Sequence, residues 1–177
     1  MVHSAYVIHT VAGPGEEASG DHLVTLNGVV RDERGNVYIA EAERHQVMKR
    51  DSNGTIRPFA GTGDEGFEGD DGPAYAARLS RPAGLAIDAA GSVYIADTGN
   101  HRIRRVGPDG VIQTIAGGGP TGAGKGSYSG DGELATLARL DSPRGVFSDS
   151  ERTIYFSDAG NRRVRRLEPL KKYDPSD

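Results

Sequence analysis

Residues 91–106 read Gly91-Ser-Val-Tyr-Ile-Ala-Asp-Thr-Gly-Asn-His-Arg-Ile-Arg-Arg-Val106, and this stretch is the clearest copy of a repeated pattern. It recurs as Arg152-Thr-Ile-Tyr-Phe-Ser-Asp-Ala-Gly-Asn-Arg-Arg-Val-Arg-Arg-Leu167. A less similar copy precedes both, and it reads Gly35-Asn-Val-Tyr-Ile-Ala-Glu-Ala-Glu-Arg-His-Gln-Val-Met-Lys-Arg50. Self-similarity of this kind is the signature of a repeat protein. The pattern therefore predicts a chain built from one small unit used three times.

Each copy predicts two strands joined by a turn. Residues 93–96 are apolar at successive positions, which is typical of a strand covered on both faces. Asp97-Thr-Gly-Asn100 is a cluster of turn formers, in which we expect Gly99 to supply a positive φ. Residues 101–106 then predict the return strand.

Two more strands complete each unit. Residues 112–116 predict an outer strand, and residues 82–88 predict an inner one. The inner strand of each copy carries a glycine, at Gly28, Gly84 and Gly145. Such glycines mark a close approach of another backbone. The unit is thus a four-stranded meander that needs cover on both faces, and the blades of an all-β propeller provide that cover.

The repeat resembles the NHL repeat, on Pro-x-Gly-Leu-Ala-Ile-Asp at 82–88 followed by residues 91–106. The glycine-rich segment 60–74 resembles the insertions of bacterial NHL proteins. The resemblance spans roughly residues 5–169 and is weakest in the first copy, where Glu41-Ala-Glu-Arg44 replaces the turn. It implies an NHL-type propeller of about three four-stranded blades.

The domain organisation follows from the repeats. We expect one propeller domain over residues 1–169 and a polar C-terminal tail over 170–177. Its predicted parts are an outer strand at 5–13 and blade repeats at about 23–61, 79–117 and 140–169. Single helical turns are expected within the linkers at 74–79 and 134–140, with Leu79 and Leu140 packed onto the blades.

Three blades make only an arc, because propellers have roughly four to eight. An arc leaves apolar blade faces and a strand edge open to water. Our hypothesis is a half-propeller that closes as a six-bladed homodimer, with residues 6–12 of one chain pairing with residues 162–167 of the other. The alternatives are a fragment of a longer propeller and a decayed gene product.

Composition excludes several classes of function. The net charge of -4 argues against binding driven by nucleic-acid phosphates. Cys 0 removes disulfides, thiolate zinc sites and cysteine nucleophiles. No apolar run is long enough to span a membrane, and residues 1–6 have no features of a secretory signal. We expect a cytoplasmic location if the chain is complete.

The repeated turn residues are predicted to be structural, because a catalytic residue is needed only once. This set comprises Asp97, Gly99, Asn100, His101, Arg102, Asp158, Gly160, Asn161 and Arg162. No catalytic residue and no cofactor are predicted.

Two kinds of side chain leave a divalent cation open as an alternative. Carboxylates in glycine-rich loops suit hard cations, and equivalent histidines resemble the metal ligands of lyases in related propeller families. The candidates are Asp70, Asp71, Asp131, Glu133, His45 and His101.

The preferred function is a non-catalytic scaffold that binds a protein or another ligand through its loop face, at residues 61–79 and 117–140. A lyase or hydrolase with a metal in the central channel is the first alternative. RNA binding through the arginine-rich outer strands is the second, although stacking aromatics are scarce. The arginines in question are Arg102, Arg104, Arg105, Arg162, Arg163, Arg165 and Arg166.

Overall fold

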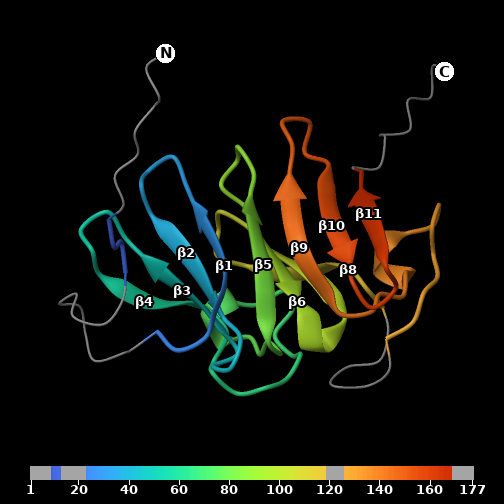
Figure 1. Cartoon of the computed structure of the whole chain (residues 1–177), viewed down its shortest axis with the longest axis horizontal. Coiled ribbons are helices and arrows are strands. Elements are labelled where there is room, and N and C mark those ends of the chain that lie inside the picture. The colour runs from blue at the N-terminus through green and yellow to red at the C-terminus, as the bar shows by residue number, and fades with distance from the viewer. Residues whose placement is uncertain (1–8, 13–22, 119–125, 169–177) are drawn as a thin grey trace, which may run out of the picture.

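Three antiparallel sheets stand side by side in the computed structural model, which describes residues 9–12, 23–118 and 126–168 (Figure 1). The first sheet consists of β1 (Leu26–Arg31), β2 (Val37–Glu41), β3 (Gln46–Arg50) and β4 (Ile56–Ala60). The second consists of β5 (Pro82–Ile87), β6 (Val93–Asp97), β7 (Arg102–Val106) and β8 (Ile112–Ala116). The third consists, within the described residues, of β9 (Pro143–Ser148), β10 (Ile154–Asp158) and β11 (Arg163–Leu167).

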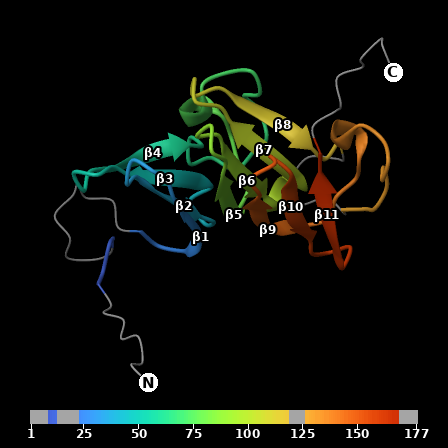
Figure 2. The ribbon, with the colours of Figure 1, turned by 90° about the horizontal axis from the view of Figure 1, so that it is seen from above.

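The sheets are arranged as neighbouring propeller blades. Figure 2 shows them fanning outward, with β1, β5 and β9 gathered on the inside and β4, β8 and β11 toward the outside. The inner strand β5 contacts both β1 and β9. The predicted all-β propeller arc of three blades is therefore confirmed, with only three strands described in the third blade.

Apolar side chains fill the two junctions between blades. Val47 and Ala60 of the first blade pack with Leu85 and Ile95 of the second. Ile103 of the second blade shares a second core with residues of the third. All five residues of β6 are buried, as expected for a strand covered on both faces.

The linkers contain the predicted helical turns. These are the short 3-10 helices η1 (Ala74–Ala76) and η3 (Ala135–Leu137). Leu79 and Leu140 lie just beyond them with exposed fractions of 0% and 1%, so their predicted packing onto the blades is also confirmed. Among the described residues, no helix has the length and apolarity needed to cross a membrane.

The inner-strand glycines mark where blades touch. A Cβ on Gly28 would collide with the carbonyl oxygen of Ala83, and one on Gly84 with that of Arg144. The predicted close approach is confirmed at these two positions. Gly145 differs, because a Cβ there would meet, among the described residues, only Ser157 Oγ of its own blade, at 3.4 Å.

Two expectations need correction. The positive φ of the repeated turn belongs to His101 (φ 54°), which follows η2 (Thr98–Asn100), and not to Gly99. Gly99 is needed because a Cβ there would clash with Ser80. The second concerns the outer strand expected at 5–13, since residues 9–12 form no strand in the single chain. Residues 5–8, residue 13 and the tail at 170–177 lie outside the described residues.

Candidate functional site

The repeated turn is organised by the carboxylate of Asp97, which lies at the end of β6 and is fully buried. Its Oδ1 accepts a hydrogen bond from the Ser80 amide at 2.7 Å, and its Oδ2 accepts one from Asn100 Nδ2 at 2.8 Å. Asn100 also donates to the carbonyl oxygen of Gly66 at 2.6 Å. One carboxylate and one amide thus hold two parts of the preceding linker against the blade.

The third blade repeats this arrangement. Asp158 accepts from the amide of Asp141 at 2.7 Å and from Asn161 Nδ2 at 2.9 Å. Asn161 also donates to the carbonyl oxygen of Ser127 at 2.8 Å. The repeated Asp and Asn side chains are therefore engaged in holding the linkers.

The arginine that completes each network lies beyond the predicted one, two positions after Arg102 in the second blade and three after Arg162 in the third. Arg104 is fully buried, and its NH2 group lies 2.7 Å from Asp70 Oδ1. Its NH1 group donates to the carbonyl oxygen of Arg78 at 2.8 Å and lies 3.8 Å from Asp97 Oδ2. Arg165 likewise pairs with Asp131 at 2.7 Å and donates to the carbonyl oxygen of Arg139 at 3.0 Å.

A signal for this pairing was present in the sequence. The arginine recurs at one position of the repeat, and its aspartate recurs at one position of the linker. Only the fold shows that the two positions meet, because they are 34 residues apart in each copy, as for Arg104 and Asp70.

Burial has an electrostatic consequence for the second blade. Removal from water raises the pKa of the Asp97 carboxyl to about 6, against the opposing effects of the Asn100 and Ser80 hydrogen bonds and of Arg104. The folded state therefore holds a proton on Asp97 more readily than the unfolded chain does.

The two equivalent histidines tie each blade to the next. His45 Nδ1 accepts a hydrogen bond from the Arg81 amide at 3.1 Å, and His101 Nδ1 accepts one from the Ser142 amide at 2.9 Å. Both histidines have a left-handed backbone, as does Arg162 at the same position of the third blade. The Nδ1 lone pairs are thus already used in contacts between blades.

The carboxylates of the aspartate candidates also have protein partners. Asp70 and Asp131 are paired with arginines, and Asp71 Oδ1 accepts from Gln113 Nε2 at 2.8 Å. Glu133 lies in a turn in which its amide donates to the carbonyl oxygen of Gly130. Within the described ranges, no three His, Asp or Glu side chains gather closely enough to hold a metal ion.

Several arginines of the proposed RNA-binding band are occupied by contacts within the protein. Arg102 stacks over the ring of Phe67, and Arg163 over that of Tyr128, each with 3.8 Å between the guanidinium carbon and the ring centroid. Arg104 is buried, and Arg166 pairs with Glu168 at 2.9 Å. The band is therefore largely a set of contacts between strands and linkers.

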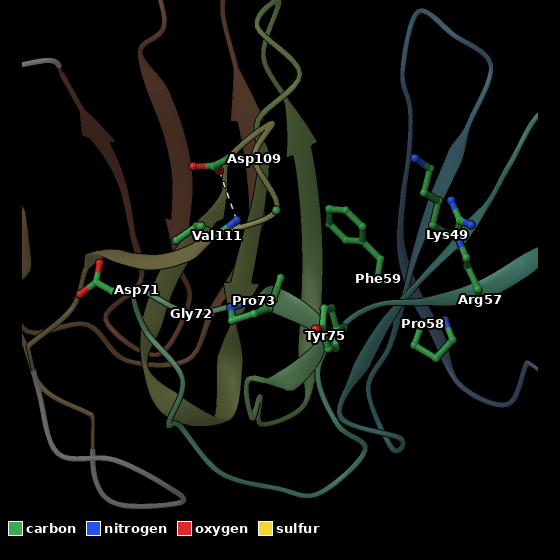
Figure 3. A pocket seen from close by; sticks show the side chains of 12 residues that line it. Lys49, Arg57, Pro58, Phe59, Asp71, Gly72, Pro73, Tyr75, Asp109 and Val111 are labelled. Atoms are coloured by element: carbon green, nitrogen blue, oxygen red, sulfur yellow. Dashed lines mark hydrogen bonds between the residues drawn. The ribbon is translucent and has the colours of Figure 1, made fainter.

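A hollow of about 550 Å³ opens between the outer parts of the first two blades (Figure 3). Phe59 of β4 points into it, and the cations of Lys49 and Arg57 lie on the same wall. The opposite wall carries Asp109, and Tyr75 of η1, 66% exposed, lies at its edge. The remaining lining residues are Pro58, Asp71, Gly72, Pro73, Ala74, Gly110 and Val111. Aromatic, cationic and anionic groups are thus presented together to solvent.

Comparisons with known proteins agree with this architecture. Residues 59–125 match the sequence model of the teneurin NHL domain. The chain is 38% identical over 108 residues to the chloroplastic protein suppressor of quenching 1 of Arabidopsis thaliana, covering 58% of this chain and 10% of that protein. It is 27% identical over 158 residues to NHL repeat-containing protein 2 of Bos taurus, covering 79% of this chain and 22% of the relative.

Solved structures show the same fold. An auxiliary nutrient binding protein from Bacteroides thetaiotaomicron superposes with a TM-score of 0.62 at 25% identity, over 78% of this chain and 36% of that one. A gluconolactonase from Xanthomonas campestris superposes with a TM-score of 0.54 at 17% identity, over 82% of this chain and 44% of that one. The fold and the turn network define a partial β-propeller. Its repeats are of the NHL type, and the chain spans only a small part of its curated relatives' length.

Proposed function

We propose that this chain is a non-catalytic platform that binds a protein or small ligand through its loop face. The observation that carries the proposal is the use of the repeated polar residues. Asp97, Asn100 and Arg104 all hold linker backbone or linker side chains in place. A platform needs loops of fixed shape, because fewer degrees of freedom are then lost when a ligand binds.

The hollow beside Tyr75 is the proposed contact region. Residues 71–75 of its lining belong to the loop region expected to bind, and the other lining residues come from β3, β4 and the turn at 109–111. Exposed aromatic side chains flanked by charges are typical of sites that recognise peptides and other polar ligands, because the ring supplies buried area and the charges set orientation. The nutrient-binding similarity, at 25% identity, is consistent with a binding role.

An enzyme remains the competing function, since one structural neighbour is a gluconolactonase. That similarity is 17% in sequence and therefore concerns the fold. The platform is favoured because the candidate histidines and aspartates are engaged in structural contacts. RNA binding is less favoured, since Arg102 and Arg104 are stacked and buried, respectively.

Panning of a random peptide library on the immobilised chain tests the proposal. We expect wild-type protein to enrich a peptide motif, and the variant Tyr75→Ser with Arg57→Ser to lose it. Arg34→Ser, at an exposed turn of the first blade, is the matched control and should retain it. Enrichment that ignores the hollow, or turnover of gluconolactone stimulated by a divalent cation, would contradict the proposal.

A further inference from the structure

The third blade has an apolar face that no described residue of the single chain covers. Val164 is 77% exposed, whereas its repeat counterparts Val47 and Ile103 are fully buried. Phe147 is 62% exposed, whereas its counterpart Ala86 is 5% exposed. Each counterpart is covered by the following blade, so this face has the composition of an interior surface.

The first blade is open in the opposite direction. Val29 is 68% exposed, whereas its counterpart Leu85 packs against the preceding blade and is 7% exposed. Leu26 is 53% exposed, and its counterpart Pro82 is buried. The two ends of the arc therefore carry the two halves of one blade-to-blade contact (Figure 2).

The junctions inside the chain show how these halves fit. Gly28 and Gly84 leave room for the backbone of the next inner strand, at Ala83 and Arg144. Gly145 leaves the same room, but no backbone of the described residues fills it. The surface is shaped to receive an inner strand of the same type.

The outer edge of β11 also has a vacant strand position within the described residues. In the second blade, β7 pairs with β8 through Ile103 opposite Ala116 and Arg104 opposite Thr114. Alignment of residues 9–12 with 113–116 would place Ala12 opposite Val164 and Thr10 opposite Arg165. In the single chain these residues form no strand, and Val11 is 49% exposed.

We propose that a second copy of this chain docks on the third blade, adding its first blade to the apolar face and its residues 9–12 to the edge of β11. In the described part of the chain, the third blade lacks a following blade and an outer strand, and the chain itself carries both, as its first blade and its residues 9–12. Its own residues 9–12 lie at the other end of the arc from β11, so they reach it from a second copy (Figure 2). A twofold axis repeats the contact at the other junction and closes a ring, leaving neither face open.

Engineered cysteines test the register, because the chain has Cys 0. Opposed residues of antiparallel strands have Cβ atoms roughly 4.5–5.5 Å apart, close to the spacing of a disulfide. We expect Ala12→Cys with Val164→Cys to give a covalent dimer on mild oxidation. The matched pair Ala12→Cys with Ser52→Cys, whose second site is a turn of the first blade, should give no such dimer.

Light scattering across a dilution series tests the association itself. We expect wild-type protein at twice the 18.7 kDa of the single chain. Val164→Asp should shift it to the single-chain mass, with circular dichroism unchanged because Val164 is exposed in the single chain. Arg34→Ser should leave the dimer intact.

Three results would overturn the proposal. They are a monomeric wild-type chain, a dimer that Val164→Asp does not weaken, and a ladder of cross-linked trimers and longer species in place of a closed pair. None of these bears on peptide binding at the hollow, so this inference and the proposed function fail separately.

Discussion

At the scale of single residues, the first blade shows which parts of the turn network depend on one another. Glu41 replaces the aspartate and keeps one of its bonds, from the Val24 amide to Oε1 at 2.8 Å. Met48, buried in the core, replaces the arginine. An apolar residue is therefore tolerated at this position in a blade that has no equivalent of Asp70 beside it in the described residues.

Replacement of Arg104 by methionine should be costly in the second blade. Arg104→Met would remove the buried cation that pairs with the carboxylates of Asp70 and Asp97, and breaking a buried ion pair in this way costs about 3–5 kcal/mol of unfolding free energy. Urea unfolding measures the loss. Arg105→Met, on the same strand but partly exposed, is the control and should cost far less. Equal losses for the two variants would contradict the role given to Arg104.

The raised pKa of Asp97 predicts a pH dependence of stability. Its pKa of about 6 in the folded state lies above the ordinary value of 3.8, so between these values the folded state holds a proton that the unfolded chain has lost. The contribution of Asp97 is therefore largest below about pH 4 and is lost as the pH rises through about 6.

The test is the difference in unfolding free energy between wild type and Asp97→Asn. This variant cannot titrate at position 97. We expect the difference, wild type minus variant, to fall as the pH is raised from about 4 to about 7. A difference that stays constant or rises would show that the carboxylate is charged in the folded state throughout this range.

At the scale of elements, the inner strands set the spacing of the blades. Gly84→Ala should lower the unfolding free energy by about 1–3 kcal/mol, because the new Cβ collides with the backbone of the next strand. Gly145→Ala should change it by less than about 0.5 kcal/mol. The unfolding free energies of both glycine variants should be measured in the Val164→Asp background, where contact between copies does not contribute. Similar losses at both glycines would contradict the proposed role of close approach.

At the scale of the whole molecule, the arc has one middle blade and two end blades. The middle blade is covered on both faces. Every residue of β6 in that blade is buried, whereas no residue of β11 in the third blade is buried. Stability in stacked repeats depends on contacts with neighbours, so the middle blade should open least often.

Hydrogen exchange followed by mass spectrometry measures this ordering. We expect the slowest exchange in residues 93–97 and faster exchange in residues 163–167. Raising the protein concentration should slow exchange in residues 163–167, because docking of a second copy would pair the open edge of β11. Exchange in β11 that is as slow as in β6 at high dilution would contradict the ordering.

The amino-acid sequence alone predicts the repeat, the strands, the helical turns of the linkers and the burial of Leu79 and Leu140. These predictions follow from local patterns of apolar and turn-forming residues. Three copies of one pattern support each prediction independently. The propeller arc followed as well, because a strand such as 93–97, apolar on both faces, needs cover on both.

The contacts between particular polar groups depend on the fold of the whole chain. Arg104 contacts a carboxylate 34 positions away, and His101 accepts a hydrogen bond from an amide 41 positions away. Gly99 is required by the side chain of Ser80 and not by its own φ angle. Contacts of this kind, and the hollow beside Phe59, arise from packing between blades and linkers, which no local pattern of residues encodes.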